Sequence, residues 1–401
     1  MCLGDDGPTG MKVLFVFGTR PEAIKLAPLV KELSARPSFE CKICVTGQHR
    51  EMLSQVLELF DLWPDWNLEL MRPDQDLAYI TGSALSGVSQ VLGAFRPDRV
   101  IVQGDTTTTF AGALAAFYHR IPVAHVEAGL RTDNIYSPWP EEVNRRLVTR
   151  IADLHLAPTV RARDNLLREG IGCKRILVTG NTGIDALLWV SALLDSRPEL
   201  RSRFEAVLPA RFEGKRLILM TGHRRESFDG GLERICGALA RIALRPDVGV
   251  VFPVHRNPNV RQAIAPLRGH ENILLIEPVD YPELVFLLKR CHFVVTDSGG
   301  IQEEAPSFGK PVLVTRDTTE RPEAMELGLA KLVATDEHRL FDEMSALLDN
   351  PGSYSRMSRI GNPYGDGRAS CRIAEWFTTS EAETTPPIVG PVSQERRSRL
   401  P

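Results

Sequence analysis

Residues 291–323, CHFVVTDSGGIQEEAPSFGKPVLVTRDTTERPE, contain the pattern that decides the fold. Residues 293–295 form a short apolar run rich in β-branched side chains, which is typical of a strand buried on both faces. The turn Asp297-Ser298-Gly299-Gly300 follows, then a segment of helical character over 301–308 and a second apolar strand over 311–314. This order predicts a βαβ unit and therefore a parallel sheet.

The turn Ser298-Gly299-Gly300 at the mouth of that helix suits an anion. Small residues let backbone N–H groups approach a ligand, and a helix start favours negative charge, so phosphate is the expected guest. Glu303 and Glu304 follow one turn later and would repel a phosphate, unless they bind a neutral hydroxylated group such as a ribose. An ordinary tight turn is the alternative for this stretch alone, because glycine-rich turns are common.

Length and composition indicate a two-domain enzyme. The 401 residues exceed one ordinary core, so two domains of about 150–200 residues each are expected. A net charge of −3 gives no basic surface for nucleic acid. Seven scattered cysteines favour a reducing cytoplasm, and Cys41-x-x-Cys44 lies in an expected strand, not at the helix start of a redox motif. We find no signal peptide and no apolar run of about 18 residues, so no membrane contact is expected.

Two cations follow the first expected strand, residues 12–17. The next segment, GTRPEAIKLAPLVKEL, reads as an amphipathic helix with Pro21 in its first turn. Arg20 and Lys25 therefore lie near a helix start, where they would hold a pyrophosphate; solvated surface cations are the alternative. Neither GxGxxG nor GxxxxGKS/T occurs at this turn, so no dinucleotide or ATP loop is indicated and we expect no cofactor.

Acidic side chains occur at further expected strand ends. Asp105 follows the strand at 99–102, and Glu127 ends the strand that begins at Ile121. Residues there line the ligand crevice of open α/β sheets, which favours a functional role. Glu141 and Arg145 are spaced i, i+4 on a helix, and an ion pair explains that spacing as well as function does.

His223 and His255 follow strands of the second half in TGHRRE and PVHRNP. Neither has the spacing of a metal ligand, so no metal site is expected. His223 is the better functional candidate, because its turn corresponds to the Arg20 turn of the first half.

The second half repeats the plan of the first, since VVTD-helix-GKPVLV corresponds to VIVQGD-helix-RIPVAHVE. We predict an α/β protein of two Rossmann-like doubly wound domains facing a cleft, with residues 11–180 in the first and 181–366 in the second. Residues 1–10 and 379–401 are expected to be a disordered extension and tail. Cations and a phosphate-accepting turn beside carboxylates fit a sugar nucleotide, whose diphosphate they would hold while the carboxylates act on the sugar.

The sequence resembles the non-hydrolysing UDP-N-acetylglucosamine 2-epimerases from about Met11 to Phe377. The segments that carry the resemblance are FGTRPEAIK, TGQHREM, GDTTTTFAGALAAFYHRIPVAHVEAGLRT, YSPWPEEVNRR, TGNTGIDAL, TGHRRESF, TDSGGIQEEAPSFGKPVLV, RDTTERPEA and NPYGDG. The resemblance implies the GT-B architecture, with the helix at 367–378 packing back on the first domain. It also implies a cytoplasmic homodimer that interconverts UDP-GlcNAc and UDP-ManNAc for surface polysaccharides, by elimination of UDP to 2-acetamidoglucal and re-addition.

The resemblance also implies roles for individual residues. It assigns proton transfer at C2 to three carboxylates, and it assigns the stabilisation of the departing pyrophosphate to three cations. The full set of implied residues is Asp105, Glu127, Glu141 and His223 as catalytic groups, and Arg20, Lys25, Arg145, Ser298, Gly299, Gly300, Glu304 and Arg321 as substrate-binding groups, with Val279 and Leu284 in the uracil loop. Gln48 and His255 correspond to an allosteric site of some relatives, although Glu51 and Asp74 depart from the regulated pattern.

Two other readings stay open. A GT-B glycosyltransferase or a hydrolysing relative would release UDP from the same substrate. A catalytically idle nucleotide-sugar binder is disfavoured because Asp105, Glu127 and Glu141 are all present.

Overall fold

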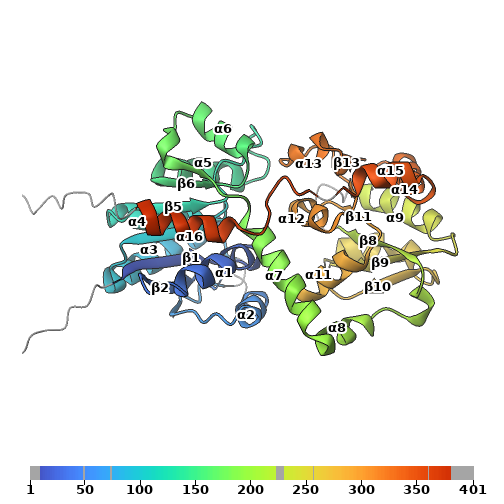
Figure 1. Cartoon of the computed structure of the whole chain (residues 1–401), viewed down its shortest axis with the longest axis horizontal. Coiled ribbons are helices and arrows are strands. Elements are labelled where there is room, and N and C mark those ends of the chain that lie inside the picture. Colours follow the sequence, from blue (N-terminus) through green and yellow to red (C-terminus); the bar gives the residue numbers. More distant parts are fainter. Residues whose placement is uncertain are drawn as a thin grey trace, which may run out of the picture.

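Two lobes of alternating strands and helices make up the molecule in this computed structural model (Figure 1). The structure describes residues 10–47, 50–72, 75–222, 230–255, 257–359 and 361–380. Each lobe holds one parallel sheet, and helix α7 lies between the lobes (Figure 1). This is the predicted α/β architecture of two doubly wound domains.

The first sheet has seven parallel strands in the order β3-β2-β1-β4-β5-β6-β7. The order reverses between β1 and β4, which is where an open α/β sheet binds ligands at its carboxyl edge. The strands are β1 (Met11–Phe17), β2 (Phe39–Val45), β3 (Trp66–Asn67), β4 (Arg99–Gln103), β5 (Val123–Val126), β6 (Leu154–Ala157) and β7 (Ile176–Val178).

The second sheet has six parallel strands in the order β10-β9-β8-β11-β12-β13. Counted within its own lobe, this is the strand order of the first sheet without its last strand, so the switch point lies between β8 and β11. The strands are β8 (Arg216–Thr221), β9 (Val248–Pro253), β10 (Ile273–Ile276), β11 (Phe293–Thr296), β12 (Val312–Val314) and β13 (Ala330–Leu332).

Helices cover both faces of each sheet (Figure 1). In the first lobe and its junction they are α1 (Arg20–Ser34), α2 (Arg50–Leu59), α3 (Leu77–Phe95), α4 (Thr107–Tyr118), α5 (Glu141–Ile151), α6 (Val160–Arg168), α7 (Thr182–Ser196) and α16 (Ala369–Ser380). In the second lobe they are α8 (Pro198–Glu205), α9 (Gly231–Ile242), α10 (Pro258–Ala263), α11 (Tyr281–Arg290), α12 (Gly299–Glu304), α13 (Pro322–Glu326), α14 (Glu337–Asp349) and α15 (Pro351–Met357).

Strand β1 is apolar and buried at every position from Val13 to Phe17. Phe15 and Phe17 point to a core cluster shared with α1 and α16, whereas Leu14 and Val16 point to a second cluster shared with α3 and α4. Side chains of a strand alternate between faces, so a strand with a helix layer on each side has no polar face. The carboxyl edge of such a strand is thereby held rigidly for the turn that follows it.

The chain crosses between the lobes twice. It passes to the second lobe near Asn181 and returns near Tyr364, and the Asn181 N–H donates to the Tyr364 carbonyl oxygen over 2.7 Å. Helix α16 then packs on α1 and α7. The Asp185 carboxylate of α7 accepts hydrogen bonds from the backbone N–H groups of Ala369 (3.2 Å) and Ser370 (2.7 Å), which fixes the start of α16. These contacts support, as a proposal, domains at 11–180 and 181–366 with the last helix on the first.

Several element boundaries differ from the sequence expectations by one or more residues, and three of these differences are informative. The strand expected from Ile121 begins at Val123, because the Ile121 N–H closes the end of α4 on the Ala116 carbonyl oxygen. The helix expected over 301–308 begins at Gly299 and becomes a 3₁₀ turn from Ala305, next to Pro306, which has no N–H to donate. Helix α16 ends at Ser380, two residues beyond the expected 378.

Candidate active site

Lys25 lies at the centre of a buried cluster of charges. Its ammonium group forms an ion pair with Glu127, and it lies 3.7 Å from a carboxylate oxygen of Glu303 in the second lobe. The Lys25 side chain is 15% exposed and the Glu127 side chain 8%. Burial lowers the pKa of Lys25, but Glu127 and Glu303 outweigh it, so the pKa lies above its ordinary value.

Glu127 directly follows β5, as predicted, and stands in the left-handed backbone region with φ of 64°. A non-glycine residue in that region is uncommon, and such strain gathers at functional sites. Its Oε2 accepts a hydrogen bond from Nε2 of Gln103 on the neighbouring strand end, over 3.0 Å. Burial raises the pKa of Glu127, although Lys25 opposes the shift. A carboxylate with raised pKa beside an ammonium group is suited to accept and return a proton.

Arg321 provides a second buried cation in the same cluster. Its Nε donates to Glu303 Oε1 over 2.6 Å, and its Nη1 pairs with Glu320. The guanidinium lies so close to Gly299 that a Cβ on that residue would come 2.5 Å from Nη1. A side chain at the second residue of the Ser-Gly-Gly turn would therefore have to displace the Arg321 guanidinium. The N–H groups of Gly299 and Gly300 open α12, where an α-helix leaves them without internal partners.

Arg20 and Glu304 face each other from the two lobes. Burial lowers the pKa of Arg20, whereas Glu304 and Asp280 raise it. Burial raises the pKa of Glu304 to about 7, even though the Tyr281 hydroxyl donates to Glu304 Oε1 over 3.0 Å. Both predicted residues therefore lie in the region where the lobes meet.

Asp105 follows β4 and forms an ion pair with Arg145 of α5. The ion pair with Glu141, one of the two explanations of the i, i+4 spacing, is not seen among the described residues, where Arg145 pairs with Asp105 and with Glu142, the latter over 3.2 Å. Glu141 is the first residue of α5, while Glu142 is fully buried and also accepts from the Thr132 N–H and Arg146. Arg145 is thus held by a neighbour that the sequence reasoning did not single out.

A second carboxylate missed by the sequence reasoning joins the carboxyl ends of β1 and β4. Glu22 of α1 is 1% exposed and accepts hydrogen bonds from the backbone N–H groups of Gly18 (3.0 Å) and Thr19 (2.7 Å). It also accepts from the Thr106 hydroxyl over 2.6 Å at the start of α4. Thr19-x-x-Glu22 is a capping box, a signal readable in the sequence. The turns that carry Arg20 and Asp105 are therefore fixed to each other.

Buried His125 bonds to the turn that carries Asp105. Its ring Nε2–H donates to the Gly104 carbonyl oxygen over 2.7 Å, and burial lowers its pKa to about 4. A neutral imidazole can donate to this carbonyl oxygen without placing a positive charge near the Asp105 carboxylate.

The remaining predicted residues lie apart or outside the described chain. Val279 and Leu284 are half-buried and pack against the hydrophobic core beside α11. His255 is exposed after β9, where its Nδ1 accepts from the Asn257 N–H over 3.2 Å. His223 and Gln48 lie outside the described residues. Among described residues, no three His, Cys, Asp or Glu side chains are grouped to hold a metal ion.

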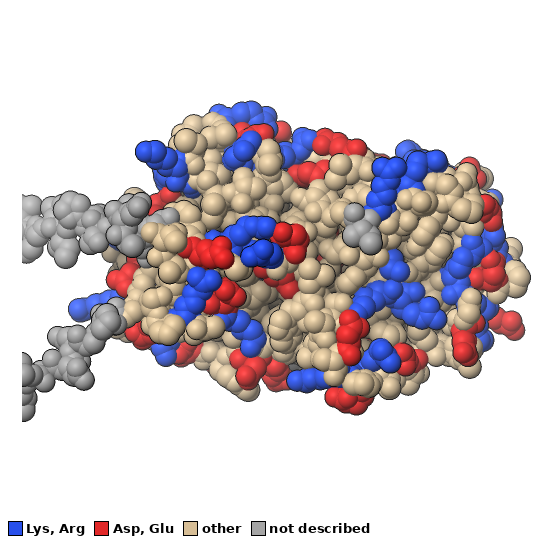
Figure 2. All heavy atoms as spheres, viewed as in Figure 1, with Lys and Arg blue, Asp and Glu red and all other residues tan. Residues whose placement is uncertain are grey.

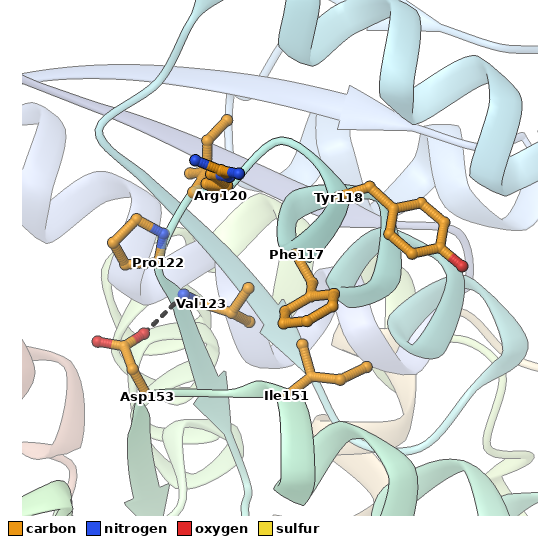
Figure 3. Close-up of a pocket in the computed structure, with 8 residues that line it drawn as sticks. Phe117, Tyr118, Arg120, Pro122, Val123, Ile151 and Asp153 are labelled. Carbon is orange, nitrogen blue, oxygen red and sulfur yellow. Dashed lines mark hydrogen bonds between the residues drawn. The ribbon is translucent and has the colours of Figure 1, made fainter. Parts of the chain in front are cut away.

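A hollow of about 620 Å³ lies at the opposite end of the first sheet (Figure 3). Phe117 and Tyr118 at the end of α4, Pro122 and Val123 at the start of β5, and Asp153 line it, and the Asp153 carboxylate accepts from the Val123 N–H over 2.7 Å. Glu127 and Asp105 follow the carboxyl ends of their strands. This hollow is therefore separate from the charged cluster.

The family model for UDP-N-acetylglucosamine 2-epimerase matches residues 31–378. The chain belongs to this family. It is 56% identical over 367 residues to the UDP-N-acetylglucosamine 2-epimerase of Escherichia coli (strain K12), covering 91% of this chain and 98% of that one. These findings confirm the resemblance in the sequence.

Solved structures agree with this family membership. The Neisseria meningitidis UDP-GlcNAc 2-epimerase bound to UDP-GlcNAc matches with a TM-score of 0.87 and 48% identity, covering 92% of this chain and 100% of that one. The glycosyltransferase SnogD from Streptomyces nogalater, 18% identical, matches with a TM-score of 0.55 over 92% of this chain and 99% of that one. That second likeness concerns the fold alone, and it places this epimerase-family chain in the GT-B architecture.

Proposed function

We propose that this chain interconverts UDP-N-acetylglucosamine and UDP-N-acetylmannosamine. The observation that carries the proposal is the meeting of Lys25, Glu127, Arg321 and the Gly299 turn at the junction of two switch-point edges. Cations and free helix N–H groups suit a diphosphate, and buried carboxylates suit proton transfer at a neighbouring carbon. Family membership and the UDP-GlcNAc bound by the Neisseria relative support the choice of substrate.

The chemistry proposed is elimination followed by re-addition. C2 of the sugar carries no acidifying carbonyl, so its proton leaves to a carboxylate while the C1–O bond breaks and UDP departs as the anion. This leaves 2-acetamidoglucal. A protonated carboxyl group then returns a proton to the other face of C2, and UDP oxygen re-forms the bond to C1. Glu127, Asp105 and Glu141 are the proposed proton carriers.

The proposed binding roles concern the diphosphate, the ribose and the uracil of the substrate. Arg20, Lys25, Arg321 and the turn from Ser298 to Gly300 stabilise the departing diphosphate, and Glu304 accepts hydrogen bonds from the ribose. Arg145 orients Asp105. His223 at the diphosphate, Val279 and Leu284 at the uracil, and a second nucleotide-sugar site at Gln48 and His255 stay predictions. The product would supply surface polysaccharide synthesis.

Incubation with UDP-GlcNAc in D2O, without an acceptor, tests this function. We expect NMR spectra to show UDP-ManNAc carrying deuterium at C2, because the proton exchanges with solvent while the glycal is held. Free UDP and free sugar in equal amounts would instead indicate a hydrolysing enzyme. Unchanged UDP-GlcNAc, with tight binding, would indicate a binder without catalysis.

We also propose that the chain acts as a homodimer in the cytoplasm. Phe117 and Tyr118 of α4 are exposed at the apolar hollow of Figure 3, which Ile151 of α5 also lines. Helix α5 exposes Val143 and Leu147 as well. A second copy would cover this face, since exposed apolar patches mark association sites. The described cysteines are all free thiols, in keeping with a reducing compartment. None of the described helices is long and apolar enough to span a bilayer.

Light scattering after gel filtration checks the dimer. We expect twice the chain mass of 44.5 kDa for the wild type. We expect the mass of one chain for Leu147→Glu, because this change places a charge in the apolar face. Leu244→Glu, at an exposed leucine on the second lobe, serves as the control and should stay dimeric. A monomeric wild type at micromolar concentration would contradict the proposal.

A further inference from the structure

Glu303 has no role in the function proposed above, yet its carboxylate contacts Arg321, Lys25 and Asn181. It lies on α12 one residue before Glu304 and is 3% exposed. Taken as sequence, it would repel a phosphate at this helix. In the structure its charge is instead directed at cations, because Arg321 Nε donates to it over 2.6 Å and Lys25 lies 3.7 Å away.

Both crossings between the lobes also converge on Glu303. The Asn181 amide Nδ2 donates to the Glu303 carboxylate over 3.0 Å, and the Asn362 amide Nδ2 donates to the Glu303 backbone carbonyl over 2.7 Å. Asn181 belongs to the first crossing and Asn362 to the second. The residue that reaches Lys25 is therefore fixed to the joint about which the lobes can move.

The contact with Lys25 joins the two lobes at the reacting groups. Lys25 and Glu127 belong to the first lobe, whereas Glu303 and Arg321 belong to the second. Glu303 is thus the second-lobe partner of the Lys25 ammonium group. Separation of the lobes would remove this partner and leave Lys25 to Glu127 alone.

The charge of Glu303 also acts on Glu127. The groups that shift the pKa of Glu127 are Lys25 and Arg321, which lower it, and Glu303, which raises it together with burial. A neighbouring negative charge makes a carboxylate a stronger base. Closure of the lobes therefore brings two groups to the site together: Glu303, which raises the pKa of Glu127, and the cation Arg321.

We propose that Glu303 is a positioning residue that fixes the Lys25 ammonium group between two carboxylates only when the lobes are closed, and so couples lobe closure to proton transfer. The proposal rests on the proposed function, in which Lys25 and Glu127 act on the sugar nucleotide. Glu303 does not touch the reacting carbon in this scheme; it acts through Lys25, Arg321 and the charge it places near Glu127.

The test compares Glu303→Gln with Glu326→Gln. Glu326 forms an ion pair with Arg161 across the same lobe boundary, but both side chains are exposed and remote from Lys25. For Glu303→Gln we expect kcat/KM for UDP-GlcNAc to fall about 10- to 100-fold, as misplaced catalytic groups do. Loss of a negative charge lowers the pKa of Glu127, so the acidic limb of the kcat/KM profile should move to lower pH. Glu326→Gln should keep kcat/KM within twofold of the wild-type value and leave the acidic limb in place.

Small-angle scattering of the ligand-free variants tests the coupling without reference to activity. We expect a larger radius of gyration for Glu303→Gln than for the wild type, and a return to the wild-type value with UDP. If Glu303→Gln fails to fold, Glu303→Asp replaces it: the charge remains, so the acidic limb should stay in place while the rate falls.

Two results would overturn the proposal. An unmoved acidic limb in Glu303→Gln, with a lowered rate, would reduce Glu303 to a structural support. An unchanged radius of gyration would remove the coupling to closure. Failure of the proposed function looks different, because the wild type itself would then leave UDP-GlcNAc unconverted while the scattering comparison still decides the coupling.

Discussion

A Glu127→Gln variant should bind UDP with nearly wild-type affinity and lose about 10²- to 10⁴-fold in kcat, the usual contribution of a proton-transferring group. Both hydrogen bonds that Glu127 accepts from described residues, from Lys25 and Gln103, end on the same oxygen, Oε2. A glutamine can place its carbonyl oxygen there and keep both bonds. The amide cannot carry a proton to and from C2, so binding and catalysis should separate.

Calorimetric titration with UDP and NMR assays of UDP-GlcNAc conversion measure the two effects. Glu32→Gln is the matched control, because Glu32 is on the same helix as Lys25 and its ion pair, with Arg36, lies near the surface. It should leave kcat unchanged. Turnover within threefold of wild type in Glu127→Gln would remove Glu127 from proton transfer.

Replacing Lys25 with methionine should destabilise the first lobe by about 3–5 kcal/mol, the cost of leaving a buried charge without its partner. Glu127 would be buried with no ion-pair partner, and the molecule would also lose its activity. The double variant Lys25→Met/Glu127→Gln removes both charges of the pair. We expect it to recover most of the lost stability and none of the lost activity.

Urea unfolding followed by circular dichroism gives the free energies of unfolding for this comparison. Lys42→Met is the control, since the Lys42–Asp65 pair is at the surface and such pairs contribute about 0–1 kcal/mol. Equal stability of Lys25→Met and Lys42→Met would show that the buried pair carries no special cost. A double variant as unstable as the single one would show that Lys25 acts through other contacts.

The sequence was sufficient where a local pattern determines position. Continuous apolar runs bounded by glycine predicted the buried strands, and the residues just after them, Asp105 and Glu127, lie at the sheet edge as expected. Lys25 could be placed near a helix start for the same reason. In these cases the neighbours along the chain decide where the side chain lies.

Partners distant in sequence could not be predicted in that way. Asn181 and Glu303 are 122 residues apart, and nothing in the spacing of either predicts that contact. The choice of Arg145 between Glu141 and Glu142 depends on which side of α5 faces Asp105, a tertiary fact. Glu22 is different, because its capping box was readable; what could not be read is that its carboxylate also reaches Thr106 of another helix.

The pairing of the two crossings has a mechanical consequence. The Asn181 N–H bonds the Tyr364 carbonyl oxygen, and an added Cβ on Gly365 would meet the Asn181 backbone nitrogen at 3.3 Å. Two chain segments bonded side by side resist sliding past one another and resist being pulled apart lengthwise. We therefore expect any relative motion of the lobes to be a rotation about this short joint, which would make the entry and exit of a sugar nucleotide depend on a single pivot.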